Sequence, residues 1–359
     1  MCLSAPTTTY TTYSLAARST ILLTGWPNAT EEKKESRKRM YALQISSFGE
    51  PSDVVELVKL PDPHDPLANE VLVAMEYAPI NGSVLQTIRG QYGRLPSLPA
   101  GLGNEGVGRI LSVGVEVDDL KVGDRVPLPS PSPSWREKII LPSTGLFPLP
   151  QNADPQQLSM LSINPPTAAL LLSEYVELKP GDWVIHNAGV GRSVIAFAKD
   201  RGLRTVSLVR RPELIDELVA TGGDIVLVDG AEISARVAKA TGNAKIALAI
   251  DGVGGEAMLS LSSCLSPGGT LVLYFAVSMK PGLASFVDLV YRNVTIRGFW
   301  FANPAFHASP KLMEAIKTGA RLIAEGKLHV PVAATYPLVA AKEAIAQAQR
   351  GGKVLFKLS

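Results

Sequence analysis

A glycine-rich turn near the middle of the chain is typical of a phosphate-binding site. An apolar segment leads into it, and the stretch reads Val184-Ile185-His186-Asn187-Ala188-Gly189-Val190-Gly191. Glycines let the backbone approach a pyrophosphate closely, and the N-terminus of the following helix attracts its charge. The turn therefore predicts a dinucleotide site, although a tight turn without a ligand would have the same composition. The cofactor-contacting residues expected here are Asn187, Gly189, Val190 and Gly191.

Two arginines follow the next predicted strand. An NAD site usually has an acid at this point to bind the ribose hydroxyls, but here Arg210 and Arg211 follow residues 205–209, with no acid before Glu213. Two guanidinium groups suit a 2′-phosphate in charge and in geometry. We therefore expect NADPH as cofactor. The alternative is a solvated basic pair on a loop.

A third glycine cluster, Asp251-Gly252-Val253-Gly254-Gly255, also follows an apolar segment. In an open α/β sheet, the loops after the strands line the ligand crevice. We expect these glycines to admit the nicotinamide half of the cofactor. An ordinary strand-to-helix turn is the alternative.

The histidines and cysteines disfavour metal chemistry. The cysteines are Cys2 and Cys264 alone, and the histidines lack metal-ligand spacing. A catalytic zinc needs three protein ligands as a rule, so we expect no bound metal. The sequence has no G-x-S-x-G turn and no plausible Ser/His/Asp set, which disfavours a hydrolase. The histidines are His64, His186, His307 and His329.

Two patterns of secondary structure position these residues. From about residue 180, apolar strand-like segments alternate with helical ones, which predicts a doubly wound parallel sheet. Between residues 40 and 150, short strands alternate with turns, which predicts a compact β domain. Two helical segments and a terminal strand follow residue 305. The expected strands include 54–60, 71–77, 106–117, 183–186, 205–209, 224–228, 246–250, 270–275 and 353–358.

Composition limits the class of protein. The 359 residues are 46% hydrophobic and 19% charged, which suits two domains with buried cores. A net charge of +2 without an aromatic-containing basic run gives no reason to expect nucleic acid as a partner. No apolar run approaches the roughly 20 residues of a membrane span, so no membrane partner is expected. The scarcity of cysteine fits a reducing compartment, and we expect the cytoplasm.

Residues 1–39 differ from the rest. The first 30 contain no acid, many Ser and Thr, and one arginine, Arg18. This composition resembles a transit peptide only weakly, because such peptides are usually rich in arginine. We expect a disordered or targeting extension that is dispensable for folding and turnover. If it is a transit peptide, the location is mitochondrial instead.

Six motifs occur in one order between residues 40 and 359. They are Gly90-Gln91-Tyr92-Gly93-Arg94-Leu95-Pro96, Gly103-Asn104-Glu105-Gly106-Val107-Gly108, Ser134-Trp135-Arg136, Ile163-Asn164-Pro165-Pro166-Thr167-Ala168, Val209-Arg210-Arg211-Pro212 and Arg297-Gly298-Phe299-Trp300. Together they resemble the medium-chain dehydrogenase/reductase superfamily. Asn104 stands where its zinc members have histidine, which matches the zinc-free branch. More narrowly, the set looks like the 2-enoyl thioester (trans-2-enoyl-CoA/ACP) reductases.

The resemblance implies an α/β fold. A GroES-like, β-rich catalytic domain of residues 40–162 and 306–359 would be interrupted by a Rossmann domain of residues 163–305. It also implies reduction of an enoyl-CoA or enoyl-ACP in fatty acid synthesis, with hydride from NADPH reaching the β-carbon. Tyr92 would give a proton to the α-carbon, and a phenol is protonated at neutral pH. A homodimer and an acyl-carrier protein as partner are further implications.

The resemblance assigns roles to seven more residues. Trp135 would take part in catalysis, with plain packing as the alternative. For Asn164 and Thr167, hydrogen bonds to the nicotinamide amide and simple helix capping are both open. The expected cofactor contacts are Asn164, Thr167, Tyr274, Phe299, Trp300 and Lys353.

Two departures from the family pattern bear on the site. The glycine turn is three residues shorter than the family's Asn-Ala-x-x-x-Gly-Val-Gly loop, and Asn81-Gly82-Ser83-Val84 stands where the family has Asn-Pro-Ser-Asp. One alternative function is therefore quinone or enone reduction on the same fold. The other is an NADPH-binding protein without turnover.

Overall fold

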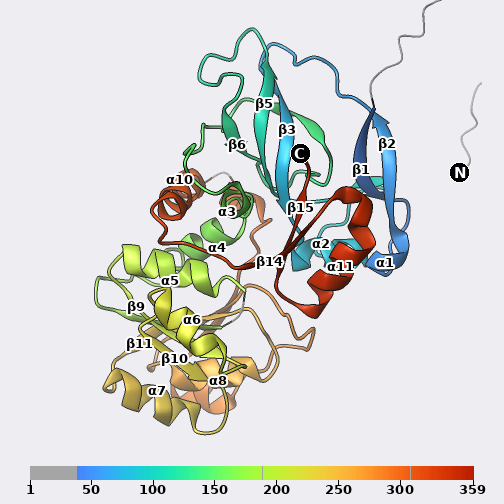
Figure 1. The fold of residues 1–359 in the computed structure, drawn as a ribbon. Coiled ribbons are helices and arrows are strands. Elements are labelled where there is room, and N and C mark those ends of the chain that lie inside the picture. The colour runs from blue at the N-terminus through green and yellow to red at the C-terminus, as the bar shows by residue number, and fades with distance from the viewer. Residues whose placement is uncertain (1–38, 188, 308) are drawn as a thin grey trace, which may run out of the picture. The chain divides into compact units, whose positions relative to one another are not determined.

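Six parallel strands form the sheet of the predicted nucleotide-binding domain (Figure 1). The computed structural model describes residues 39–187, 189–307 and 309–359. The strand order is β10-β9-β8-β11-β12-β13, so the chain winds outward from β8 to β10 and then crosses back to β11. Between β8 and β11 the direction of winding reverses, which is where such sheets bind ligands. The strands are β8 (Trp183–Asn187), β9 (Arg204–Val209), β10 (Ile225–Val228), β11 (Ile246–Asp251), β12 (Thr270–Leu273) and β13 (Thr295–Gly298).

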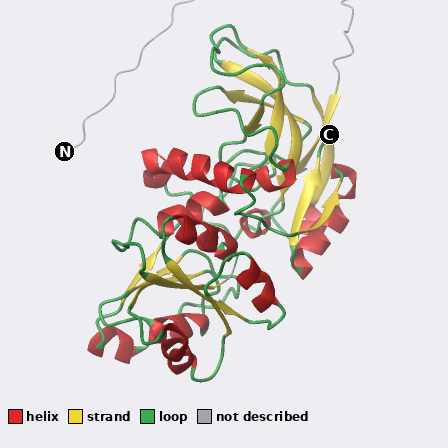
Figure 2. Cartoon of the chain, turned by 60° about the vertical axis from the view of Figure 1, so that its left-hand side comes forward, coloured by secondary structure: helices red, strands yellow, loops and turns green. Residues whose placement is uncertain are grey.

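Helices cover both faces of this sheet (Figure 2). Successive strand residues point to opposite faces. Val184 of β8 therefore packs in one cluster with Phe197 of α5, whereas Ile185 packs in another with Leu261 of α8. Helix α5 ends before Gly202, whose φ of +70° fits the predicted helix stop. The helices of this part are α5 (Gly191–Asp200), α6 (Leu214–Ala220), α7 (Ile233–Thr241), α8 (Ala257–Cys264) and the π-helix η1 (Val287–Tyr291).

The β-rich part contains two sheets built from residues on either side of the parallel sheet. The larger has the order β14-β15-β3-β5-β6, with β7 also paired to β3, and the smaller has the order β2-β1-β4. Strand β15 pairs antiparallel with β3, with Phe356 opposite Ala78, so the two ends of the domain meet in one sheet. The strands are β1 (Arg39–Ile45), β2 (Val55–Pro61), β3 (Glu70–Pro79), β4 (Ala100–Gly101), β5 (Val107–Val113), β6 (Arg125–Pro127), β7 (Lys138–Pro142), β14 (Val332–Tyr336) and β15 (Lys353–Lys357).

Helix α4 links the two parts, because it packs on both α5 and α10. Ser309 caps α10 by accepting a hydrogen bond from the Lys311 N–H at 3.3 Å, and Pro310 opens that helix. The remaining helices are α1 (Pro51–Val54), α2 (Gly82–Ile88), α3 (Pro155–Leu158), α4 (Asn164–Leu171), α9 (Pro304–His307), α10 (Pro310–Ala324), η2 (Leu338–Ala340) and α11 (Ala341–Arg350).

The observed topology confirms the predicted α/β class, with a parallel doubly wound sheet and a β-rich part. The domain boundaries at residues 162/163 and 305/306 stay a prediction. Residues 1–38 of the predicted extension lie outside the described residues, and Arg39 already belongs to β1. Within the described ranges, no helix is both long enough and apolar enough to cross a membrane.

Candidate active site

Asn187 and Asp251 join the two strands at which the winding reverses. Each is the last residue of its strand, and the Asn187 amide donates to the Asp251 carboxylate over 2.7 Å. The Asn187 carbonyl oxygen accepts the Gly252 N–H at 2.8 Å. Both ends of this amide are thus engaged within the protein, so Asn187 orders the two loops. A cofactor contact by Asn187 stays a prediction.

The predicted glycine turn leads directly into α5. Val190 stands at the N-cap and Gly191 opens the helix, which has no side-chain cap. No atom lies within 4 Å of the position that a Cβ on Gly189 would occupy. Uncapped N–H groups beside an open glycine fit a diphosphate.

Tyr274 occupies part of the space around this turn. Its hydroxyl oxygen accepts the Val190 N–H at 3.2 Å, and a Cβ on Gly252 would lie only 2.3 Å from that oxygen. Gly252 therefore has to be glycine for Tyr274 to lie here. Burial raises the pKa of the Tyr274 hydroxyl, which keeps it a neutral phenol. In the shortened loop, this phenol takes one of the N–H groups of the turn.

Arg210 and Arg211 lie where a nucleotide 2′-phosphate is expected. They follow the end of β9, which is hydrogen-bonded to β8. Both are exposed, and neither guanidinium group has a hydrogen bond or ion pair with any described residue. By contrast, Arg204 at the start of the same strand is paired with Asp224 at 2.8 Å. Two unpaired cations at this edge fit NADPH, as does the open turn.

Tyr92 and Trp300 meet across the site. Trp300 follows β13, and its indole N–H donates to the Tyr92 hydroxyl oxygen at 3.1 Å. The two rings are edge-on, with centroids 6.1 Å apart. A Cβ on Gly93 would lie 3.3 Å from the Trp300 ring, so the glycine beside Tyr92 permits the contact. Both aromatic side chains are half-buried.

Phe299 faces the core beneath this contact. It is 5% exposed and packs between the rings of Tyr175 and Phe306, at 6.5 Å and 4.7 Å between centroids. The position of this side chain supports an anchoring role for the segment that carries Trp300. The predicted contact between Phe299 and the cofactor gains no support from it.

Lys353 is connected to a buried polar cluster that the sequence reasoning missed. Its ammonium donates to the Asn81 carbonyl oxygen at 2.8 Å, and the Asn81 amide donates to Glu105 at 2.7 Å. Glu105 is 0% exposed, and burial raises the pKa of its carboxyl to about 7, against the lowering effect of Asn81. Burial lowers the pKa of Lys353, which the charge of Glu105 opposes. The one sequence signal for this cluster was Glu105 inside the Gly-Asn-Glu-Gly motif.

Asn164 and Thr167 lie in the first turn of α4, where the chain crosses into the parallel-sheet part. Asn164 is half-buried and Thr167 is 4% exposed. Cofactor contacts by these two residues stay predictions.

Trp135 lies in the core, so the predicted part in catalysis gains no support from its position and stays a prediction. Its side chain is 0% exposed and packs edge-on against Phe356, with centroids 5.0 Å apart. Its indole N–H donates to the Pro79 carbonyl at 3.2 Å. Backbone hydrogen bonds to Leu102 and from Leu43 hold the residue on both sides. An enclosed side chain with a satisfied N–H favours the packing alternative.

Asn104, at the position of the zinc-ligand histidine, is engaged within the protein. Its carbonyl oxygen accepts from Asn81 at 3.1 Å, and its amide donates to the Ser83 hydroxyl at 2.9 Å. Among the described residues there is no group of three or more His, Cys, Asp or Glu side chains that could hold a metal. His186 is buried against Ser207, and His64 bonds a backbone carbonyl.

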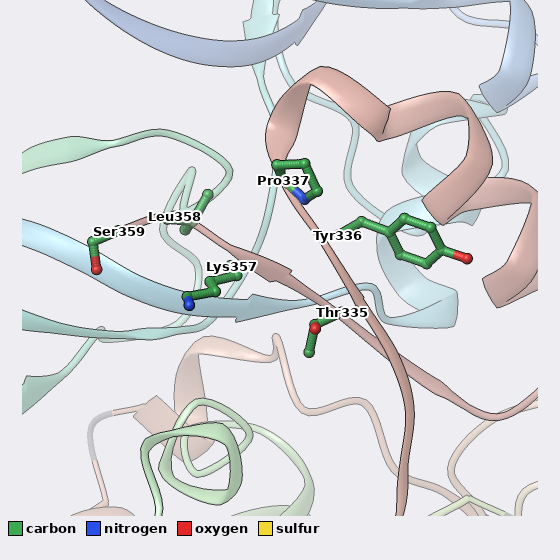
Figure 3. A pocket seen from close by; sticks show the side chains of 6 residues that line it. All are labelled: Thr335, Tyr336, Pro337, Lys357, Leu358 and Ser359. Carbon is green, nitrogen blue, oxygen red and sulfur yellow. The ribbon is translucent and has the colours of Figure 1, made fainter.

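A pocket of about 270 Å³ lies elsewhere, at the ends of β14 and β15 (Figure 3). None of the predicted site residues lines it. The predicted glycine turn, Arg210 and Trp300 instead follow the ends of strands β8, β9 and β13 of the parallel sheet. The lining residues of the pocket are Thr335, Tyr336, Pro337, Lys357, Leu358 and Ser359.

The fold, with Asn104 at the position of the zinc-ligand histidine, defines a medium-chain dehydrogenase/reductase. Two family models match in accordance with this: the alcohol dehydrogenase GroES-like domain over residues 67–150, and the zinc-binding dehydrogenase over residues 189–318. The enoyl-[acyl-carrier-protein] reductase, mitochondrial, of Mus musculus is 36% identical over 317 residues, which are 86% of this chain and 85% of that protein. The chain belongs to the family of enoyl-[acyl-carrier-protein] reductases.

Two solved structures share the fold. The complex of Etr1p with NADP and crotonyl-CoA is 24% identical with a TM-score of 0.81, over 89% of this chain and 100% of that one. A mycobacterial quinone oxidoreductase is 25% identical with a TM-score of 0.75, over 89% and 99% of the two chains.

Proposed function

We propose that the protein reduces the 2,3-double bond of an enoyl thioester with NADPH, in fatty acid synthesis. The observation that carries this is the Tyr92–Trp300 pair at the carboxyl edge of the nucleotide sheet, in a chain of the enoyl-[acyl-carrier-protein] reductase family. When bound, NADPH supplies the hydride, which reaches the β-carbon. The protein then has to supply a proton to the α-carbon and donors for the enolate oxygen.

Tyr92 has the chemistry of the proton donor. Because its oxygen accepts the Trp300 N–H, the hydroxyl hydrogen remains free to point elsewhere. Donation of an N–H to this oxygen also stabilises the phenolate that forms when the proton leaves. An enolate needs hydrogen-bond donors in a site from which water is excluded, and the half-buried position of Tyr92 suits this.

Arg210 and Arg211 support the choice of NADPH over NADH. They are cations without partners among the described residues, at the strand end where the nucleotide ribose is expected. A 2′-phosphate offers such cations charge-assisted hydrogen bonds.

The carrier, location and assembly are finer proposals. We propose an acyl-carrier protein as the carrier of the substrate, because the similar reductases of Mus musculus and Homo sapiens are named for it. Both are also named mitochondrial, which supports a mitochondrial location over the expected cytoplasm. A homodimer is the proposed assembly, on the resemblance alone.

A substrate panel with NADPH tests the function. Crotonyl-CoA, a longer enoyl-CoA and the matching enoyl-ACP should each be reduced, whereas a simple quinone should react much more slowly. The fold shared with a quinone oxidoreductase makes quinone reduction the second candidate, and a reversed order of rates would favour it. Tight NADPH binding without turnover on any of these would favour the non-enzymatic alternative.

A further inference from the structure

Glu105 joins three segments that carry site residues. Its two carboxylate oxygens accept the Asn81 amide at 2.7 Å and the Ser162 N–H at 3.0 Å. Asn81 occupies the N-cap position of α2, which leads to Tyr92, and Ser162 precedes α4, which carries Asn164 and Thr167. Asn81 in turn accepts from Lys353 of β15. One buried carboxylate therefore fixes three segments that are distant in sequence.

Lys353 lies beside the nucleotide-facing loops. Its neighbour Val354 accepts the Ile80 N–H at 2.9 Å, which places the start of β15 next to Asn81 and α2. A Cβ on Gly82 would lie 3.5 Å from the ring of Phe275, in the loop that follows β12. The Lys353–Asn81 pair is therefore close to the carboxyl edge of the parallel sheet.

An amide separates Lys353 from Glu105. The Lys353 ammonium donates one hydrogen bond to Asn81 and has no other hydrogen-bond or ion-pair partner among the described residues, so two of its three hydrogens remain for a ligand. Direct pairing with Glu105 would have engaged the ammonium with a carboxylate. With Asn81 between them, Glu105 still compensates the charge of Lys353, and the remaining ammonium hydrogens of Lys353 stay free.

We propose that Glu105 is a positioning residue of this site, which acts through Asn81 to keep Lys353 charged and oriented toward the nucleotide. The inference rests on the proposed function, because it takes NADPH as the ligand of Lys353. Asn104 belongs to the same hydrogen-bond network, since it bonds both Asn81 and Ser83 at the start of α2.

The pH dependence of NADPH binding follows from the charges that face Lys353. Burial lowers the pKa of Lys353 and Glu105 raises it, and Glu105 is the charged group that acts on it among the described residues. Removal of the Glu105 charge should lower the pKa of Lys353 further. The loss of NADPH affinity at alkaline pH should then begin at a lower pH than in the unaltered chain.

The experiment is a titration of the full chain with NADPH, followed by its fluorescence across pH 6–10, for the unaltered protein, Glu105→Gln and Glu76→Gln. Glu76→Gln is the matched control, because Glu76 pairs with Arg109 and Arg125 elsewhere in the β-rich part. We expect the alkaline loss of affinity to move to lower pH in Glu105→Gln alone. In Glu105→Gln/Lys353→Arg the alkaline loss should disappear, since a guanidinium stays charged.

Each outcome decides the inference. An unshifted pH dependence in folded Glu105→Gln overturns it, as does a failure of Lys353→Arg to remove the alkaline loss. If Glu105→Gln does not fold, Asn81→Ala carries the test, because it breaks the link and keeps both charges. NADPH affinity at neutral pH should then fall several-fold as Lys353 loses its orientation, and unchanged affinity in the folded variant overturns the inference. If the unaltered chain binds no NADPH at any pH, the proposed function and the inference both fail, whereas NADPH binding with an unshifted profile overturns the inference alone.

Discussion

The Trp300 indole N–H donates to the Tyr92 hydroxyl oxygen at 3.1 Å, although the two residues are 208 positions apart in the chain. Trp300 comes from the end of the parallel sheet and Tyr92 from the loop after α2. The contact fixes the phenol at the oxygen and leaves its hydrogen free. It therefore couples the orientation of the proposed proton donor to the nucleotide-binding part.

Tyr92→Phe should lower the turnover rate about 10²–10⁴-fold, because positioned acid groups contribute in that range. The ring and its edge-on packing against Trp300 are kept, so NADPH affinity should change little. The measurement is steady-state turnover on each accepted enoyl substrate, together with an NADPH titration. Tyr291→Phe, at an exposed tyrosine of η1, is the control. Unaltered turnover in Tyr92→Phe would remove Tyr92 from the mechanism.

Replacement of Arg210 and Arg211 by alanine should weaken NADPH much more than NADH. Hydrogen bonds to a charged group contribute roughly 1.5–3 kcal/mol each, so the two together correspond to a large loss of NADPH affinity. Dissociation constants for both nucleotides provide the test, with Arg350→Ala in α11 as an exposed control. Equal losses for the two nucleotides would mean that the 2′-phosphate binds elsewhere.

Trp135→Ala should lower the free energy of unfolding by about 3–5 kcal/mol, the usual range for a large buried aromatic residue. Because Trp135 is enclosed in the core, the turnover rate per folded molecule should stay close to that of the unaltered protein. Urea unfolding and active-site-normalised kinetics measure the two effects. A large loss of turnover in Trp135→Ala with unchanged stability would support the catalytic role instead.

His186 should make the protein less stable in acid. Burial lowers its pKa to about 4 from 6.5, so the unfolded chain binds a proton below pH 6.5 that the native state does not. Stability from this group is complete above pH 6.5 and is lost as the pH falls to 4, by about 3 kcal/mol. Glu105 acts in the opposite sense, because its raised pKa favours the native state below pH 7.

The contribution of His186 is isolated by comparison with His186→Gln in urea unfolding between pH 7 and pH 4. Between pH 7 and pH 4 the unaltered protein should lose about 3 kcal/mol of unfolding free energy relative to His186→Gln. A difference that stays constant with pH would mean that His186 is protonated in the native state.

Metal removal should leave turnover unchanged. The Asn104 amide is engaged by Asn81 and Ser83, and an amide is a poor ligand for zinc. Activity after dialysis against a strong chelator, together with elemental analysis, is the measurement. One zinc per chain that is needed for activity would contradict this expectation.

The buried strands of the parallel sheet were predictable because they are short, mostly apolar runs. Predicted residues 205–209 and 246–250 correspond to β9 and β11 to within one residue at either end. Strands β13 and β14 escaped prediction, since both are short and largely exposed and lack a clear apolar pattern. Helix α2 was missed as well, because it follows β3 after only two residues.

The site residues show where sequence reasoning stops. Backbone hydrogen bonds with Leu43 and Leu102 orient the Trp135 side chain toward the core, and no local sequence pattern reveals that orientation. Glu105 is held by Asn81 and Ser162, which are 24 and 57 residues away. Such convergence depends on the tertiary fold, so a motif can name Glu105 without giving its function.

The pairing of β15 with β3 also sets the order in which the two sheets can form during synthesis. All six strands of the parallel sheet lie between residues 183 and 298, so that sheet can form while the ribosome is still translating the rest. The larger β sheet has to wait for residues 353–357, whose partner strand emerged much earlier. Lys353 is among these late residues, so a nascent chain has its nucleotide turn before it has the cation that we expect to contact the nucleotide.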